Sequence, residues 1–175
     1  MAVNQAELRK YIRDVPDFPS QGILFRDITP LLRNGRAFDA ALDLLHAAVH
    51  DMAPQVIVGI ESRGFLFGAP LALRLGIGFV PVRKPGKLPW ARQTETYSLE
   101  YGAGQLEMHD DALDRDQRVV LIDDVLATGG TAAASSRLVE RIGGVVAGLA
   151  FVVELTALRG RDRLADRTVR SVLAY

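Results

Sequence analysis

The hydrophobic positions of the chain follow two different periods. Apolar runs rich in β-branched residues occupy 56–60, 119–122 and 145–155, and such runs are typical of strands buried on both faces of a parallel sheet; 78–83 and 169–173 are expected to be two further strands. The segment 36–52 repeats apolar residues every three or four positions, which predicts a helix, and 65–75 and 132–142 are also expected to be helices. The order of these elements predicts an α/β fold with a central, mostly parallel sheet of about five strands and helices on both faces.

Two segments lie outside this alternation. Residues 1–34 contain an expected short helix at 5–13, a turn-rich connector at 15–22 and a short apolar piece at 23–25, and we expect them to form a cap over one end of the sheet. The long polar insertion 84–104 shows strand-like alternation from 94 to 101, which indicates a hairpin arm and a mobile catalytic lid; a solvated surface loop is the alternative. We therefore expect a single domain spanning 1–175.

The composition excludes several classes of protein. The chain has 21 basic and 21 acidic residues among 175, so bulk charge does not favour nucleic-acid binding. It has no cysteine and hence no disulfide framework or thiolate metal site. The first 14 residues are too polar for a signal peptide, and no apolar run approaches the ~20 residues of a membrane span. These features predict a soluble, cytoplasmic protein.

Chemistry gathers directly after the apolar run 119–122. Asp123 and Asp124 come first, followed by a hydroxyl- and glycine-rich stretch and an expected helix. Glycines allow a ligand to approach the backbone, and the N–H groups at a helix N-terminus bind anions, so this stretch suits a phosphate. The carboxylates suit sugar hydroxyls or a hydrated metal ion. The pattern favours a loop that binds a phosphorylated ribose. The alternative is an ordinary strand–loop–helix connection with a capping threonine and a turn glycine.

Two further loops supply positive charge. Arg63 follows the strand 56–60 and precedes a helix, so it should lie at the same sheet edge as Asp123, where anion binding is favoured over a surface ion pair. Arg83, Lys84 and Lys87 lie within five consecutive residues where the insertion begins. A phosphoribose that carries a pyrophosphate would satisfy all three loops, and its chemistry would be glycosyl transfer through an oxocarbenium-like transition state.

Several motifs together carry a family resemblance that covers nearly the whole chain. The chain resembles the type I phosphoribosyltransferases, and among them the adenine-specific members, at 16–19, 25–30, 61–68, 83–89, 97–102 and 123–131. The resemblance implies purine salvage, in which the 5-phosphoribosyl group of phosphoribosyl pyrophosphate (PRPP) passes to adenine and gives AMP and pyrophosphate. It also implies a Mg²⁺ requirement, with the ion held mainly by substrate and water and no direct protein ligand, and a homodimer.

The resemblance also implies roles for individual residues. Hypoxanthine-guanine enzymes carry an Asp at the position of Ala127, so here Glu100 is the candidate catalytic residue, a general acid at N7 of adenine. Phe25 would stack on adenine with Val125 on its other face, while backbone groups near Leu24 and Arg26 read the base edge. PRPP and ribose phosphate would bind at Asp123, Asp124, Ala127, Thr128, Gly129, Gly130 and Thr131, and pyrophosphate at Ser62, Arg63, Arg83, Lys84, Lys87 and Tyr101.

Other interpretations of the same residues remain open. One is a phosphoribosyltransferase for another purine such as xanthine, against which the matched segment 25–27 speaks. Another is a regulator with the same fold that senses PRPP or a nucleotide without turnover, although such proteins usually carry an added DNA-binding domain. A third is a generic nucleotide-binding module, which leaves Lys84, Lys87 and Glu100 without a role. No role is assigned to Trp90 or Arg92.

Overall fold

The computed structural model describes residues 4–98 and 103–175. The chain divides into two compact units, Met1–Leu44 and Leu45–Tyr175, and each is described here by itself. Among the described residues, no helix combines the length and the apolar character needed to cross a membrane.

The first unit is a small mixed structure. Its elements are α1 (Gln5–Leu8), η1 (Arg9–Tyr11), β1 (Arg13–Pro16), β2 (Leu24–Asp27), α2 (Thr29–Arg33) and the first part of α3 (Gly35–Val49). β1 and β2 pair antiparallel, with Val15 opposite Phe25. The sequence indicated only a turn-rich connector at 15–22, because its two prolines argue against a strand. The strand nevertheless forms, since Pro16 lies at its end in a two-stranded sheet, where a missing N–H is tolerated.

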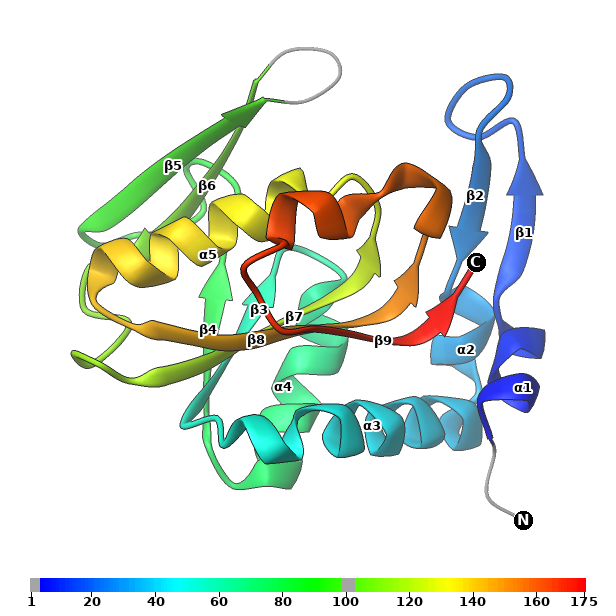
Figure 1. Cartoon of the computed structure of the whole chain (residues 1–175), viewed down its shortest axis with the longest axis horizontal. Helices are drawn as coiled ribbons and strands as arrows, with labels where there is room; N and C mark the ends of the chain where they lie inside the picture. The colour runs from blue at the N-terminus through cyan, green and yellow to red at the C-terminus, as the bar shows by residue number, and fades with distance from the viewer. Residues whose placement is uncertain (1–3, 99–102) are drawn as a thin grey trace. The chain divides into compact units, whose positions relative to one another are not determined.

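The second unit contains the predicted parallel sheet. Its strands are β3 (Val56–Ile60), β4 (Gly78–Val82), β7 (Arg118–Leu126), β8 (Val145–Glu154) and β9 (Val169–Ala174), in the order β4-β3-β7-β8-β9, and all pairings are parallel (Figure 1). This confirms the expectation of about five core strands.

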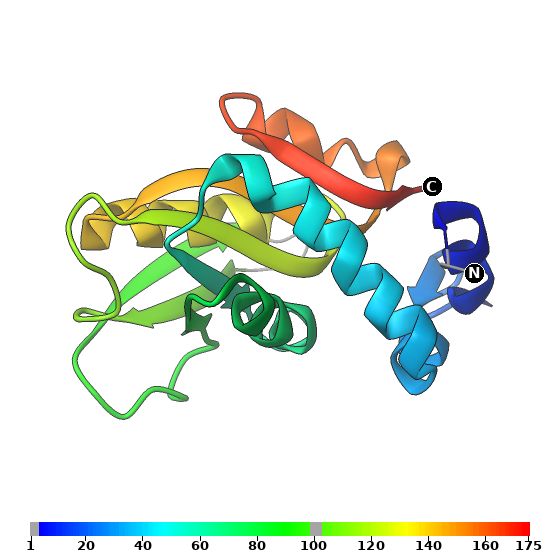
Figure 2. The same ribbon diagram turned by 90° about the horizontal axis from the view of Figure 1, so that it is seen from below.

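Two helices cover the sheet from opposite sides. α5 (Gly130–Ile142) lies above it in Figure 1 and α4 (Gly64–Leu75) below it, and Figure 2 shows α4 on the near side of the strands. The remaining elements are the short 3₁₀ helices η2 (His50–Met52), η3 (Thr156–Leu158) and η4 (Gly160–Leu164). The core between α5 and the sheet is built from buried apolar side chains, including Val58, Leu121, Leu138, Leu149 and Phe151.

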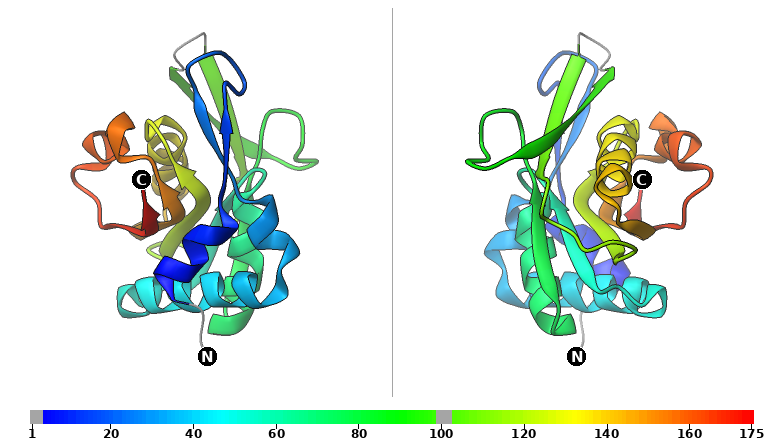
Figure 3. Two further views of the ribbon diagram at one scale, coloured as in Figure 1. Left: turned by 90° about the vertical axis from the view of Figure 1, so that its right-hand side faces the viewer. Right: turned by 90° about the vertical axis from the view of Figure 1, so that its left-hand side faces the viewer.

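The polar insertion forms an arm. We use this word for β5 (Arg92–Ser98) and β6 (Ala103–His109), which pair antiparallel along their full length. The base of the arm is joined to the end of β4 by reciprocal backbone hydrogen bonds between Arg83 and Glu107, at 2.9 and 2.7 Å. β5 runs beside α5 (Figures 1 and 3). The expected hairpin arm is thus confirmed over its described strands.

The strand order places a ligand-binding position between β3 and β7. From β3 the chain crosses through α4 to β4 on one side, and from β7 it crosses through α5 to β8 on the other. The two crossovers therefore diverge at the carboxyl ends of β3 and β7. In open α/β sheets, ligands bind at such a reversal of strand order.

Candidate active site

The two adjacent carboxylates lie within β7 rather than after it. The sequence placed the end of this strand at residue 122, but the ladder with β8 continues through Asp123 opposite Phe151 and Val125 opposite Val153. The apolar run ends at Ile122, yet β8 is long enough to extend the pairing to Leu126. Both carboxylates lie beside the start of α4, since Asp124 pairs with Arg63 and a Cβ on Gly64 would lie 3.0 Å from Asp123 Oδ1.

Asp124 is a deeply buried carboxylate that pairs with Arg63. Its residue is 3% exposed, and the Nε of Arg63 lies 2.9 Å from its Oδ2 atom. Within residues 4–98 and 103–175, no N–H or O–H group is aligned to donate a hydrogen bond to this oxygen. Arg63 therefore supplies charge to Asp124 without saturating its lone pairs, which leaves acceptor capacity for a ligand hydroxyl or water.

A glycine allows the two loops to approach each other. A Cβ atom on Gly64 would lie 2.6 Å from the carbonyl oxygen of Ile122 and 3.0 Å from Asp123 Oδ1. Gly64 is the first residue of α4, directly after Arg63. The absence of a side chain at this position is what lets the N-terminus of α4 reach the acidic end of β7.

The carboxyl pair titrates away from its ordinary range. Burial, and then the neighbouring Asp124 charge, raise the pKa of Asp123 well above the usual value, although its Oδ1 accepts a 2.9 Å hydrogen bond from the backbone N–H of Asp124. Burial also raises the pKa of Asp124, and the Arg63 charge opposes that rise. The site thus favours partners that donate hydrogen bonds or bring positive charge to the carboxylates.

The phosphate loop, residues 127–131, is held in shape by close backbone contact. Gly129 has φ +79°, and a Cβ on it would lie 2.3 Å from the carbonyl oxygen of Gly160. A Cβ on Gly160 would in turn lie 2.3 Å from the carbonyl oxygen of Ala127. α5 begins at Gly130, so its free N–H groups and the positive end of its dipole face the space beside the loop. This arrangement suits a phosphate.

The cations predicted to bind pyrophosphate have different surroundings. Arg83 donates from Nε to Glu61 Oε2 at 2.9 Å, and the same oxygen accepts from the backbone N–H of Lys84 at 2.8 Å. Burial acts to raise the pKa of Glu61, but these hydrogen bonds outweigh it and hold the pKa below its ordinary value. The side chains of Lys84 and Lys87 are exposed. Arg83 thus ties the end of β4 to the end of β3, and its role toward pyrophosphate stays a prediction.

Ser62 lies between the acidic and basic residues of the β3 loop. Ser62 is exposed, and the peptide bond between Glu61 and Ser62 is cis, a conformation that no local sequence pattern indicates. Thr128 and Ala127 are half-buried in the phosphate loop, as is Val125 before it. The structure therefore brings the predicted loops 61–64 and 123–131 together at one edge of the sheet, as their positions after β3 and β7 require.

The predicted adenine-binding residues of the first unit lie on β2. The half-buried ring of Phe25 packs edge-to-face on Phe18, with ring centroids 5.2 Å apart. Arg26 forms an ion pair with Asp14 across the β1–β2 ladder, and Leu24 is 44% exposed. Val125 belongs to the second unit, and the adenine-binding roles of all four residues stay predictions.

Glu100 and Tyr101 lie outside the described residues. Sequence reasoning also missed functional neighbours that the structure reveals: Glu61, Tyr97 and Gly160. A half-buried acid after a strand and a glycine facing the phosphate loop carry no local pattern of their own, since both depend on segments far away in the chain. Only the alternation of 94–101 hinted that Tyr97 lies on a strand of an arm.

Comparisons with known proteins agree with this geometry. Residues 29–173 match the model of the phosphoribosyl transferase domain family. Adenine phosphoribosyltransferase from Roseiflexus castenholzii is 57% identical over 175 residues, which cover 100% of both chains. The crystal structure of adenine phosphoribosyltransferase from Thermoanaerobacter pseudethanolicus has a TM-score of 0.96 and 49% identity, covering 98% of this chain and 100% of that one.

A third relative was solved with ligands. The Saccharomyces cerevisiae adenine phosphoribosyltransferase, in complex with an imino-altritol bisphosphate and adenine, has a TM-score of 0.93 and 41% identity, covering 98% of this chain and 99% of that one. The family match extends over most of the chain, and the curated relative is matched over its whole length. This chain therefore belongs to the phosphoribosyltransferase family, among the adenine phosphoribosyltransferases.

Proposed function

We propose that this enzyme transfers the 5-phosphoribosyl group of PRPP to adenine, giving AMP and pyrophosphate, as a step of purine salvage. The observation that carries the proposal is the end of β7, where Asp123 and Asp124 lie shortly before the phosphate loop and Arg63, in the loop after β3, pairs with Asp124. A phosphorylated ribose with a charged leaving group fits this combination of donors, acceptors and cations. The ligands of the yeast relative, a bisphosphate and adenine, belong to that protein and support the same substrates here.

The phosphate loop would hold the 5-phosphate of PRPP. Backbone N–H groups at the start of α5 point toward an anion beside Gly129, and Thr131 adds a hydroxyl donor. The helix dipole contributes about 0.3–1 kcal/mol to such an anion and up to ~2 kcal/mol in a partly buried site. Asp123 and Asp124 would then accept hydrogen bonds from the ribose hydroxyls next to the phosphate.

The cations would stabilise the leaving pyrophosphate. The bond between the anomeric carbon and pyrophosphate breaks, its electron pair leaves with the pyrophosphate oxygen, and a ring nitrogen of adenine forms the new bond to that carbon. Arg63 and the exposed Lys84 and Lys87 supply positive charge toward the departing group. Adenine loses its N–H proton as the new bond forms. Glu100, placed at N7 by family resemblance, would take up this proton in the direction of AMP formation and would act as the general acid that returns it in the reverse direction.

The donor set fits a magnesium ion held mainly by substrate. Within the part of the chain that the structure describes, no group of three or more His, Cys, Asp or Glu side chains could hold a metal ion. Asp123 and Asp124 remain as acceptors for the water shell of Mg²⁺, and Asp124 Oδ2 has lone-pair capacity for it. Bound with PRPP, the ion would neutralise the developing pyrophosphate charge.

The homodimer is also part of the proposal. Leu66 and Leu73 lie seven residues apart on α4 and are 44% and 82% exposed, an apolar stripe that a second copy of the chain would cover. We expect light scattering to give twice the chain mass, and Leu73→Glu to lower it to one. A wild-type monomer would contradict the dimer without affecting the reaction. A cytoplasmic location also belongs to the proposal, because a chain without cysteine suits a reducing compartment.

The reaction is tested by product stoichiometry. Enzyme incubated with PRPP, Mg²⁺ and adenine should form AMP and pyrophosphate in a ratio of one to one, and Asp124→Asn should abolish most of this turnover. Release of pyrophosphate without AMP would indicate hydrolysis instead of transfer. Binding of PRPP without any product would favour the sensing role.

A further inference from the structure

A hydrogen bond joins the arm to the phosphate loop. Thr131 Oγ1 donates to the hydroxyl oxygen of Tyr97 at 3.2 Å. Tyr97 lies on β5 and Thr131 in the first turn of α5. The two residues are 34 positions apart in the chain, so the bond exists only because β5 packs along α5.

The position of the Tyr97 ring is fixed by its neighbours. Its partner across the arm is Gly104 on β6, and a Cβ on Gly104 would lie 2.6 Å from Tyr97 Cζ and 2.8 Å from Cε1. The ring therefore lies over the glycine, and its apolar edge packs against the core under α5. Glycine at 104 thus determines where the Tyr97 hydroxyl points.

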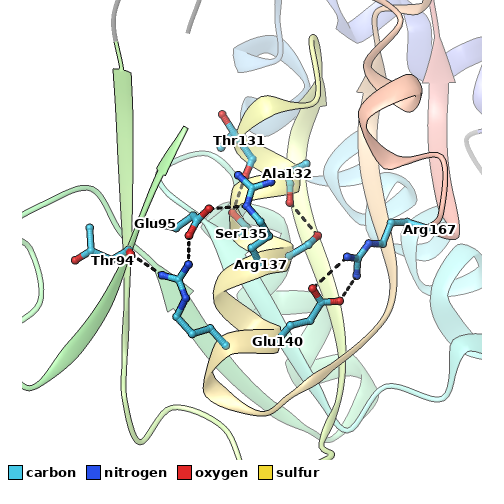
Figure 4. A network of polar contacts seen from close by, with 10 residues as sticks. Thr94, Glu95, Thr131, Ala132, Ser135, Arg137, Glu140 and Arg167 are labelled. Atoms are coloured by element: carbon cyan, nitrogen blue, oxygen red, sulfur yellow. Dashed lines mark hydrogen bonds and ion pairs between the residues drawn. The ribbon is translucent and has the colours of Figure 1, made fainter. Parts of the chain in front are cut away.

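Ion pairs fix the position of β5 along α5. Glu95 accepts hydrogen bonds from Arg137 and Arg141 of α5, and Arg141 Nη1 also donates to the carbonyl oxygen of Thr94 at 2.8 Å (Figure 4). Glu95 is buried, and the two hydrogen-bonded arginines, with Arg137 first, hold its pKa below the ordinary value against burial. Two residues further along the same strand, Tyr97 meets the phosphate loop.

The bond has a chemical consequence for a bound phosphate. A threonine hydroxyl has one proton to donate, and phosphate oxygens only accept. When a phosphate oxygen accepts the hydrogen bond from the Thr131 hydroxyl, Thr131 no longer donates to Tyr97. The Tyr97 hydroxyl can then rotate and donate a hydrogen bond to Thr131 Oγ1. The Thr131 oxygen then stays hydrogen-bonded and its proton stays directed at the phosphate, since linked hydroxyls polarise one another.

We propose that Tyr97 is a positioning residue that directs the Thr131 hydroxyl toward the 5-phosphate of the substrate. The inference rests on the proposed function, because it takes the phosphate loop to bind that group. Tyr97 itself need not touch the substrate. Its effect is expected on the binding of phosphorylated ligands and not on the binding of adenine.

The conservative variant Tyr97→Phe should fold. Tyr97 lines an open pocket of about 460 Å³, together with Thr96, Gly130, Ala133, Arg137 and Arg163. Loss of one hydroxyl beside such a pocket is a small change in packing. Thr96→Val is the matched control: it removes a hydroxyl from the same strand, whose partner is Gln105 within the arm. An unchanged melting temperature for both variants would show that the arm remains in place.

The test is a double-mutant cycle with ribose 5-phosphate as the probe. We expect Tyr97→Phe to weaken ribose 5-phosphate binding and to raise the KM for PRPP by about 3- to 10-fold, the scale of one hydrogen bond, with the KM for adenine unchanged. In a Thr131→Val background the same change should have no further effect, whereas Thr131→Ser, which keeps the hydroxyl, should preserve the dependence on Tyr97. Gly104→Ala should displace the Tyr97 ring and weaken ribose 5-phosphate binding to a similar extent.

Two results would overturn the inference. One is a Tyr97→Phe enzyme with unchanged affinity for ribose 5-phosphate, and the other is a pair of effects from Tyr97→Phe and Thr131→Val that simply multiply. The proposed function fails differently: the wild-type enzyme would then bind neither ribose 5-phosphate nor PRPP, or Thr131→Val would leave that binding unchanged.

Discussion

Arg63 and Asp124 form an ion pair that joins the carboxyl ends of the two central strands, with 2.9 Å between Nε and Oδ2. Arg63 follows β3 and Asp124 lies in β7, so the pair spans the point where the strand order reverses. Burial raises the pKa of Asp124, and the Arg63 charge opposes that rise next to the phosphate loop. The titration of the predicted ribose-binding carboxylates is therefore linked to a residue of the predicted pyrophosphate site.

Removing the Arg63 charge should move the pH dependence of the reaction. Because Arg63 opposes the burial that raises the pKa of Asp124, Arg63→Gln should raise that pKa further. The acid limb of kcat/KM for PRPP should then shift to higher pH, so activity is lost sooner on acidification. Arg63→Lys keeps a cation and should shift the limb less. Identical acid limbs in all three enzymes would contradict the role of the pair.

The close contact at Gly64 predicts a strong effect of a single methyl group. In Gly64→Ala the new Cβ would meet the carbonyl oxygen of Ile122 and the Asp123 side chain, both of them in β7. Overpacking of this kind costs about 1–3 kcal/mol of unfolding free energy, and it should also raise the KM for PRPP because Asp123 is displaced. Urea unfolding and steady-state kinetics measure the two effects.

Gly35→Ala is the matched control for Gly64→Ala. Its Cβ would meet nothing within 4 Å, and it opens helix α3. Since alanine is favoured over glycine in helices, this variant should be as stable as the wild type or slightly more so. Equal losses in both variants would mean that the contact at β7 is not the cause.

Glu154 predicts how stability falls in acid. Hydrogen bonds from Arg161, at 2.7 and 2.8 Å, hold the pKa of Glu154 below its ordinary value against burial, and Ser171 adds a third hydrogen bond at 2.6 Å. A depressed pKa contributes stability above the unfolded value, near 4.5, and loses it as the pH falls through the folded value. Half of the Arg161 side chain is exposed, so the contribution is about 1 kcal/mol or less.

Glu154→Gln tests this contribution. Its free energy of unfolding should lie below that of the wild type at pH 7, and the difference should shrink as the pH is lowered below the unfolded value, near 4.5. Asp111→Asn is the control, at an exposed position in the turn before β7. Its free energy of unfolding should match that of the wild type at pH 7 and at acidic pH. A gap between Glu154→Gln and the wild type that stays constant with pH would show that the loss comes from packing and not from ionisation.

Glu100 carries the predicted proton transfer. If it is the general acid at N7 of adenine, Glu100→Gln should lower kcat by roughly 10²–10⁴-fold and change the KM for PRPP little. Pre-steady-state measurement of AMP formation separates this chemical step from product release. Full turnover in the variant would refute the role.

The periodicity of the sequence predicted most of the fold, but not its boundaries. The apolar run 119–122 identified the central strand, yet β7 continues through both aspartates because β8 offers pairing partners up to Glu154. Asp123 is polar and was therefore assigned to a loop. Likewise, β1 was missed because Pro16 reads as a turn residue until its edge position is known.

The candidate site was predictable in its loops and not in its contacts. Arg63 and Asp124 were each expected at the same sheet edge from the order of strands, because parallel strands end together. The pairing of Arg83 with Glu61 and of Thr131 with Tyr97 joins residues 22 and 34 positions apart. Such pairs depend on how β4 and β5 pack, and no local spacing encodes them.

The most direct measurement of the central claim is turnover with PRPP and Mg²⁺ when adenine, hypoxanthine, guanine and xanthine are offered separately. The predicted readout of the 6-amino group by backbone groups, and an alanine at position 127 where hypoxanthine-guanine enzymes carry an Asp, both favour adenine. We therefore expect AMP from adenine and little product from the 6-oxo purines, since a backbone carbonyl left unpaired costs about 1–3 kcal/mol. Comparable turnover of hypoxanthine, guanine or xanthine would contradict the proposed adenine specificity while leaving the phosphate loop and its carboxylates in place.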